Sequence, residues 1–194
     1  DLAKNNIGPY VLSELLCEFG FNYSRCEDIL FALESSGKIF KSLTHRIIVD
    51  RKQLIIQELS GTNELSGTND EQFLIESSDT EIDFPVHYEI NYIEPDAFIM
   101  DRSPRNAVLD CDKLDFPLKI RRWRKGDRFK PLGMQGQKLI SDLLIDLKLS
   151  IIDKESVYVL ESKSDIVWVV GIRVSDDFKV TKDTKRLIHF KEII

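Results

Sequence analysis

The residues best suited to chemistry in this chain are cations, and they gather in one short stretch. Between Lys119 and Lys130 there are seven of them against one acid, Asp127: Lys119, Arg121, Arg122, Arg124, Lys125, Arg128 and Lys130. Trp123 and Phe129 stand among them. Concentrated cations beside aromatic side chains suit a polyanion whose bases or sugars are also touched. The alternative is a solvated basic hairpin with both aromatics in the core.

Turn-forming residues interrupt this basic stretch (residues 119–130) and close its C-terminal end. Gly126-Asp127 and Pro131-Leu132-Gly133 are typical of tight turns, because glycine reaches backbone angles that other residues resist and proline fixes its own. The cations therefore flank turns instead of lying along one helix. Gly126 and Asp127 are expected to shape the turn and not to touch a ligand.

Strands and one helix are expected to position the basic stretch. Residues 117–123 predict a strand that leads into it. The apolar residues of 139–148 recur at helical spacing and predict a helix that packs on the core. Other short apolar runs predict strands at 73–75, 87–93, 97–100, 107–109, 157–160, 166–170, 178–180 and 187–190.

Residues 1–58 predict a small domain of two helices and a hairpin. Apolar spacing indicates a helix over 9–19. A second helix is expected to begin at Ser24, because Ser24 and Glu27 have the spacing of a capping box, and to end at Gly37. Residues 47–49 and 54–56 then predict two strands around a polar turn.

This order of elements also fits a winged-helix DNA reader, with the second helix as the recognition helix. The polar positions of that helix include Glu27, Asp28 and Glu34, with Arg25 as its only cation. Phosphates repel such a face, so the pattern disfavours DNA recognition.

Residues 59–72 are expected to form an exposed loop. Leu-Ser-Gly-Thr-Asn at 59–63 recurs at 65–69, and a short tandem duplication of polar residues is tolerated best in a loop. The phosphate-binding pattern Gly-x-x-x-x-Gly-Lys-Ser/Thr is absent from the sequence. The sequence thus predicts an α+β chain: a helical-plus-hairpin domain over 1–58, this loop, and a strand-rich α+β domain over 73–194.

The formal net charge of −6 hides a sharp division along the chain. Residues 1–78 carry a net −5, residues 79–116 a net −7, and residues 117–194 a net +6. A division of this kind indicates that the C-terminal end meets a polyanion. In the alternative, the cations pair with the acids of 79–116 within the fold.

Signals for export, membrane insertion and catalysis are missing. The chain has no apolar run near the ~20 residues of a membrane helix, and it starts without a signal-peptide pattern or an initiator Met, as an excised piece of a longer protein would. The scattered Cys17, Cys26 and Cys111 favour a reduced, cytoplasmic protein. His45 and His87, like the third histidine, lie in no nucleophile or zinc motif, and the acids of 110–115 lack the pattern of a calcium loop, so neither a catalytic residue nor a metal site is expected.

Three motifs together resemble the C-terminal domain of bacterial tRNA-Ile lysidine synthetase. They are Arg-x-x-x-x-Gly-Asp-Arg-Phe-x-Pro-Leu-Gly-Met over 121–134, Lys-Leu-Ile-Ser-Asp over 138–142, and Trp-Val-x-Gly-x-Arg over 168–173. The resemblance covers about residues 117–180. Residues 1–58 loosely resemble the middle, substrate-binding domain of that family.

The resemblance implies a part of an enzyme. The family uses ATP, with Mg, to activate the wobble cytidine of isoleucine tRNA with a CAU anticodon, and then attaches lysine to form lysidine. Adenylation and lysine attack belong to an N-terminal domain with a Ser-Gly-Gly-x-Asp-Ser loop, which this sequence lacks. The chain alone is therefore expected to be inactive and to hold no cofactor, with ATP and lysine bound by the absent domain.

The resemblance also implies that the C-terminal region binds tRNA away from the anticodon. The candidate contacts are Arg121, Arg122, Arg124, Lys125, Arg128, Lys130, Lys138 and Arg173. Arginine grips phosphate with a planar fork and lysine acts as a point charge, while duplex RNA is read mostly through shape, phosphates and 2′-hydroxyls. A structural role remains open, in which the C-terminal domain braces the catalytic domain or forms a homodimer.

Overall fold

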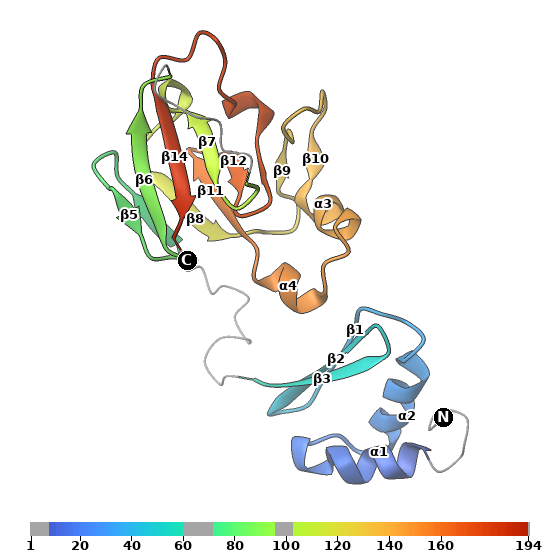
Figure 1. The fold of residues 1–194 in the computed structure, drawn as a ribbon. Coiled ribbons are helices and arrows are strands. Elements are labelled where there is room, and N and C mark those ends of the chain that lie inside the picture. Colours follow the sequence, from blue (N-terminus) through green and yellow to red (C-terminus); the bar gives the residue numbers. More distant parts are fainter. Residues whose placement is uncertain (1–7, 60–71, 96–102, 194) are drawn as a thin grey trace. The chain divides into compact units, whose positions relative to one another are not determined.

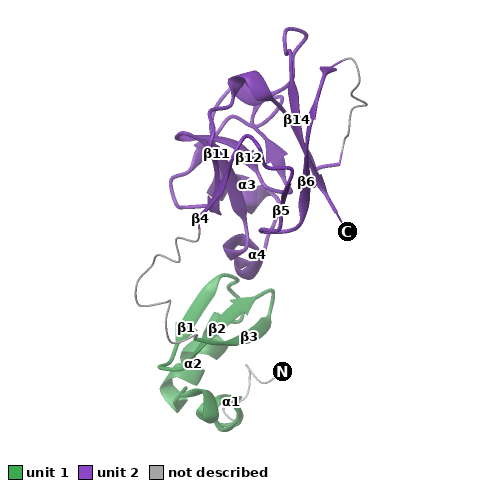
Figure 2. Ribbon diagram, turned by 90° about the vertical axis from the view of Figure 1, so that its left-hand side faces the viewer, with its two compact units in different colours: residues 1–69 green, residues 70–194 purple. Residues whose placement is uncertain are grey.

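The computed structural model describes residues 8–59, 72–95 and 103–193. The chain divides into two compact units, Asp1–Asn69 and Asp70–Ile194, which are coloured separately in Figure 2. The expected strand at 97–100 and nearly all of the duplicated segment at 59–72 lie outside the described residues. Within the described residues, none of the helices is both long and apolar enough to cross a bilayer.

Unit 1 packs two helices against a three-stranded sheet. Its elements are α1 (Gly8–Leu16), the 3₁₀ turn η2 (Cys17–Phe19), α2 (Tyr23–Ala32), β1 (Lys38–Lys41), β2 (His45–Asp50) and β3 (Gln53–Glu58), with antiparallel strand order β1-β2-β3. Its core joins the helices to the sheet through Leu16, Phe21, Cys26, Ile29 and Ile47. The expected hairpin is confirmed as β2 and β3, with Arg51 and Lys52 both at positive φ in the turn. The sequence did not predict β1.

The predicted capping box of the second helix is wrong. Asn22, not Ser24, is the N-cap of α2, and its side-chain oxygen accepts a hydrogen bond from the backbone N–H of Arg25 at 3.0 Å. The helix also ends at Ala32, before the expected stop at Gly37. Asn is as good an N-cap as Ser, so the earlier of two suitable residues begins the helix.

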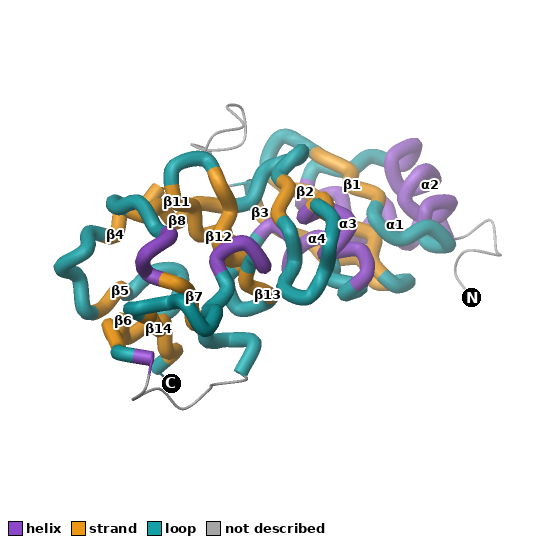
Figure 3. Tube along the Cα trace, turned by 90° about the horizontal axis from the view of Figure 1, so that it is seen from above, coloured by secondary structure: helices purple, strands orange, loops and turns teal. Residues whose placement is uncertain are grey.

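Unit 2 is built from two antiparallel sheets that pack face to face. One has the order β13-β12-β11-β8-β4 and the other β5-β6-β14-β7. Seen from above, β4, β8 and β11 lie in one layer, with β5, β6 and β14 in the other (Figure 3). The strands are β4 (Gln72–Ile75), β5 (Glu81–Ile82), β6 (Tyr88–Ile93), β7 (Ala107–Asp110), β8 (Leu118–Arg122), β11 (Tyr158–Ser162), β12 (Asp165–Val169), β13 (Arg173–Val174) and β14 (Leu187–Glu192).

The five-stranded sheet is buried on both faces. Because side chains alternate along a strand, Leu160 of β11 and Trp168 of β12 face the other sheet, while Val159 and Val169 face outward. The outward face is covered by α3 (Ile140–Asp146), which contributes Ile140 and two leucines to a second core. This arrangement explains why 157–160 and 166–170 are apolar without interruption.

The basic stretch begins within β8 of the five-stranded sheet and ends just after β9 (Arg128–Phe129). The chain then returns through β10 (Lys138–Leu139), which pairs with β9 and leads directly into α3. Figure 1 shows β9, β10 and α3 together at one side of unit 2. A short helix, α4 (Ile151–Glu155), comes after α3, and 3₁₀ turns occupy η4 (Cys111–Lys113) and η5 (Asp176–Phe178).

The predicted α+β class is confirmed, with one strand misplaced in unit 2. The runs at 73–75, 87–93, 107–109, 117–123, 157–160, 166–170 and 187–190 are strands, and α3 is the expected helix. The strand expected at 178–180 is wrong, because Asp176 closes a 3₁₀ turn there: its carboxylate accepts hydrogen bonds from the Lys179 ammonium at 3.0 Å and from the Gly133 amide at 3.0 Å. The sequence did not predict β5, α4 or the short β9, β10 and β13 strands.

Candidate nucleic-acid interface

Arg121 is a buried member of the basic stretch. Its side chain is 6% exposed, and its two terminal nitrogens donate to the two carboxylate oxygens of Asp127 at 2.8 and 3.1 Å. Its Nε donates to Glu161 on β11 at 2.7 Å, and Lys119 lies 2.9 Å from the other oxygen of Glu161. Desolvation acts to lower the pKa of the guanidinium, but the hydrogen bonds that it donates to both carboxylates raise the pKa above its ordinary value. Arg121 is therefore a structural cation in an almost fully buried network.

This network fixes the turn at the end of β8. The Asp127 carboxylate accepts a third hydrogen bond, from the backbone N–H of Arg124 at 2.7 Å, and the Asp127 N–H donates to the Arg124 carbonyl at 3.1 Å. Gly126 sits between them at a φ of 98°, which favours glycine. The Asp127 carbonyl then accepts from the Ile140 amide at 2.9 Å, so the turn is tied to the start of α3.

The fixed turn presents exposed cations. Arg124, Lys125 and Arg128 are all exposed. Arg128 precedes Phe129 on β9, and Phe129 is 3% exposed and lies in the core under α3. Because successive side chains of a strand point to opposite sides, Arg128 points away from the core. Over the described ranges, the side chains of Lys125 and Arg128 make no ion pair or hydrogen bond within the chain. Their positive charge is thus available to a ligand.

Lys130 and Lys138 are less available. Lys130 lies 3.1 Å from Asp177 and 3.5 Å from Asp176, with 28% of its side chain exposed. Its pKa is raised, first by its hydrogen bond to Asp177. Lys138 is 22% exposed and pairs with Asp146 of α3. A phosphate would have to displace these carboxylates.

Contacts with Tyr158 and Glu155 hold Arg122 in place at the end of β8. Its guanidinium lies 5.2 Å from the centre of the Tyr158 ring and donates to the Glu155 carbonyl at the end of α4. The neighbouring Trp123 donates its Nε1–H to the Lys154 carbonyl at 2.6 Å. The end of α4 therefore supports two consecutive residues of the basic stretch.

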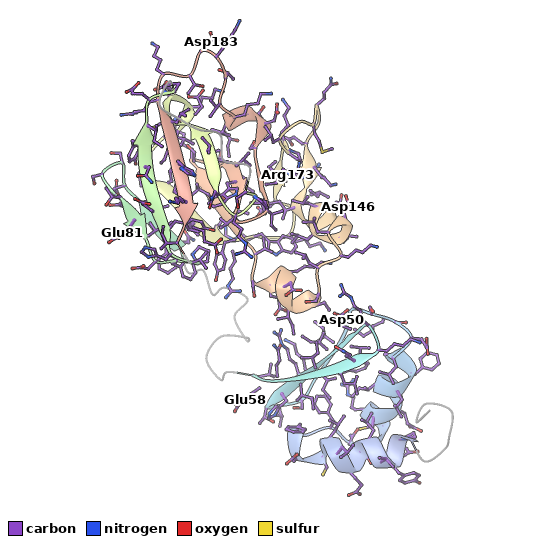
Figure 4. The ribbon with its side chains drawn as sticks, in the orientation of Figure 1. Asp50, Glu58, Glu81, Asp146, Arg173 and Asp183 are labelled. Carbon is purple, nitrogen blue, oxygen red and sulfur yellow. The ribbon has the colours of Figure 1, made fainter. Side chains whose placement is uncertain are left out.

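The structure brings the segment of Arg173 to the end of the basic stretch. The Leu132 amide donates to the carbonyl of Val174 at 3.0 Å, and the Asp176 amide donates to the carbonyl of Lys130 at 2.7 Å. The hydrogen bond from the Gly133 amide, with help from Lys179, lowers the pKa of Asp176 to about 2. Figure 4 labels Arg173 on β13 and Asp146 on α3. Arg173 is exposed and, within the described part of the chain, its side chain is not paired with an acid.

Two family models match the chain. The one described as "TilS substrate binding domain" matches residues 2–59, and the one described as "TilS substrate C-terminal domain" matches residues 118–190. The chain belongs to the TilS family. It carries these two domains, and the basic stretch lies within the second.

Individual TilS relatives agree with this assignment. The chain is 39% identical to the tRNA(Ile)-lysidine synthase of Parabacteroides distasonis over 92% of its length, and 34% identical to that of Bacteroides thetaiotaomicron over 93%. It spans only 40% and 39% of those two proteins. A solved structure titled "Crystal structure of TILS C-terminal domain" aligns with 61% of this chain and 88% of its own, at 20% identity and a TM-score of 0.48.

Among the residues that the structure describes, the acids that pair with Lys119, Arg121, Lys130 and Lys138 lie outside residues 79–116. Lys119 and Arg121 pair with Asp127 and Glu161, and the later lysines pair with Asp146, Asp176 and Asp177. The alternative in which the acids of 79–116 pair with the cations of the C-terminal region fails for these four, although Lys163 of that region does lie 2.9 Å from Asp115. Glu161 was missed, although an acid directly after the apolar run 157–160 is itself a signal, since a buried carboxylate needs a cation.

Proposed function

We propose that this chain is the tRNA-recognition part of an ATP-dependent ligase that attaches lysine to the wobble cytidine of isoleucine tRNA with a CAU anticodon. The names of the relatives and the two matched domains support this reading. The observation that carries it is the fixed turn around Asp127, which holds Lys125 and Arg128 exposed and without acidic partners among the described residues. Exposed, unneutralised cations on a fixed turn suit a phosphate backbone.

The eight candidate residues take different roles in this proposal. Arg124, Lys125, Arg128 and Arg173 contact phosphates directly, because they are exposed. Lys130 and Lys138 contact RNA only by exchanging a carboxylate for a phosphate. Arg122 reaches a base or ribose, and Arg121 acts through Asp127 by positioning the turn.

Catalysis is assigned to a part of the full-length enzyme outside this chain. ATP, Mg and lysine would bind there, since the Ser-Gly-Gly-x-Asp-Ser loop is missing from this sequence. Recognition is assigned to residues 73–194, with 1–58 as a substrate-binding domain joined through 59–72. The free thiols of Cys17, Cys26 and Cys111 suit a reducing, cytoplasmic setting.

The test is a titration of the chain with isoleucine tRNA (CAU anticodon), methionine tRNA and a DNA duplex. The variant replaces three exposed cations by alanine: Lys125→Ala, Arg128→Ala and Arg173→Ala. Preference for tRNA, weakened in the variant, supports the proposal. Unchanged binding in the variant, together with a dimeric mass in solution, would favour the bracing or homodimer role instead. Preference for the DNA duplex would favour a winged-helix reader.

A further inference from the structure

A cleft of about 490 Å³ opens beside Arg122, at one end of the two sheets of unit 2. Arg122 ends β8 and is the register partner of Tyr158, which begins β11. Glu192 ends β14 and is the register partner of Tyr88, which begins β6. All four residues line the cleft, together with Arg105 and Val86. The cleft therefore arises where four strands of the two sheets begin and end.

The polar groups of this cleft are fixed and varied. Arg122 lies against the Tyr158 ring and donates to the Glu155 carbonyl, so its guanidinium plane is held in place. Arg105 is 64% exposed and only loosely paired with Glu192, at 3.7 Å. Burial raises the pKa of Tyr88 to about 12, which keeps its hydroxyl neutral. The lining thus offers a planar cation, a loosely held cation and a carboxylate acceptor.

This combination fits one nucleotide. The volume lies within the usual range of small-molecule sites, roughly 300–1,000 Å³. A guanidinium plane stacks on bases, an exposed arginine meets a phosphate, and a carboxylate accepts from an exocyclic amine. The cleft also adjoins the basic stretch, because Arg122 belongs to both.

We propose that this cleft holds one unstacked nucleotide from a single-stranded part of the RNA that the basic stretch binds. Arg122 stacks on the base, Arg105 contacts the phosphate, and Glu192 accepts a hydrogen bond from the base edge. The inference rests on the proposed function, since it takes RNA as the ligand of the adjoining cations. It adds a site that reads an unpaired nucleotide to a surface that reads backbone charge.

The test compares three RNA probes that share one duplex. One is blunt, one carries a short single-stranded 5′ extension, and one carries a short single-stranded 3′ extension. The wild-type chain is expected to bind one of the extended probes about tenfold more tightly than the blunt one, a typical effect of stacking one base. Fluorescence anisotropy at fixed salt gives the affinities.

Two variants separate stacking from charge. Val86→Trp fills the cleft at a residue that is 42% exposed, and Arg122→Lys keeps the charge but removes the plane. Both are expected to lose the tenfold preference, and Val86→Trp, which changes no cation, is expected to keep binding to the blunt duplex. Lys182→Ala is the control, since Lys182 is a cation that is not among the residues lining the cleft, and it should keep the preference.

The outcomes distinguish the two proposals. If the wild type binds blunt and extended probes equally, the cleft proposal is overturned and RNA recognition by the basic stretch stands. A preference that survives in both variants also overturns the cleft. If no probe binds, both proposals are overturned.

Discussion

Arg121 and Asp127 join the end of β8 to the turn beyond it through two parallel hydrogen bonds of 2.8 and 3.1 Å. The same guanidinium also reaches Glu161, and the side chains of all three residues are no more than 14% exposed. The buried Arg121 thus sets the position of the exposed cations on the turn. Replacing Arg121 should destabilise the fold, and weaker RNA binding should follow from that.

Arg121→Ala is expected to destabilise unit 2 by about 3 kcal/mol, because it leaves carboxylates buried without their partner. Lys119 remains near Glu161, so the low end of the usual range applies. Urea unfolding followed by tryptophan fluorescence measures this, since Trp123 and Trp168 both lie in unit 2. Arg128→Ala, at an exposed position, should change the free energy of unfolding by less than about 0.5 kcal/mol. Equal effects of the two substitutions would contradict a structural role for Arg121.

Gly126→Ala tests the conformation of the turn. A Cβ at Gly126 would meet no atom within 4 Å, so any cost comes from its φ of 98°. We expect a loss of about 1 kcal/mol in unfolding free energy and weaker RNA binding. Gly136→Ala is the control, because Gly136 has equal space and no positive φ. A neutral Gly126→Ala would show that the turn does not need the left-handed conformation.

The sequence predicted elements well where the apolar spacing was clear, as for the strands around Trp168 and the helix α3. The start of α2 was predicted at the wrong residue, because Asn22 and Ser24 are both good N-caps and only tertiary packing selects one. The turn at Asp176 was missed because one of the groups that stabilise it, the Gly133 amide, lies far away in the sequence.

A capping box begins α4, the helix whose C-terminal end contacts Arg122 and Trp123 of the basic stretch. Ser150 accepts from the Asp153 amide at 3.1 Å, and Asp153 accepts from the Ser150 amide at 3.3 Å. Ser150→Ala should cost about 1 kcal/mol in unfolding free energy. Because α4 supplies the carbonyl that binds the Trp123 indole, the variant should also change native-state tryptophan fluorescence. Loss of stability without any change in that fluorescence would contradict the contact between α4 and the basic stretch.

Asp176 gives a pH prediction. Its pKa is lowered to about 2 from an ordinary value of 3.8, first by the Gly133 amide and then by Lys179. A lowered pKa stabilises the fold fully above about pH 4, and this contribution is lost as the pH falls toward 2. Carboxyl NMR should therefore find Asp176 about nine-tenths ionised at pH 3. A midpoint near 3.8 would contradict the hydrogen bonding around Gly133.

For the site, composition located the basic stretch but did not sort its cations. Arg121 and Arg128 are alike in sequence, yet one is buried in a carboxylate network and the other is exposed. The difference depends on Glu161, forty positions along the chain from Arg121, and on strand pairing between β8 and β11. Only the folded register reveals which arginine faces inward.

The most direct measurement is the salt dependence of tRNA binding by the wild-type chain and by a Lys125→Ala/Arg128→Ala variant. Each lost phosphate contact should reduce the magnitude of the slope of log K against log salt by about one unit, so the double variant should have a slope shallower by about two units. Lys182→Ala should leave the slope unchanged. A double variant with the wild-type slope and affinity would contradict the assignment of the basic stretch to RNA.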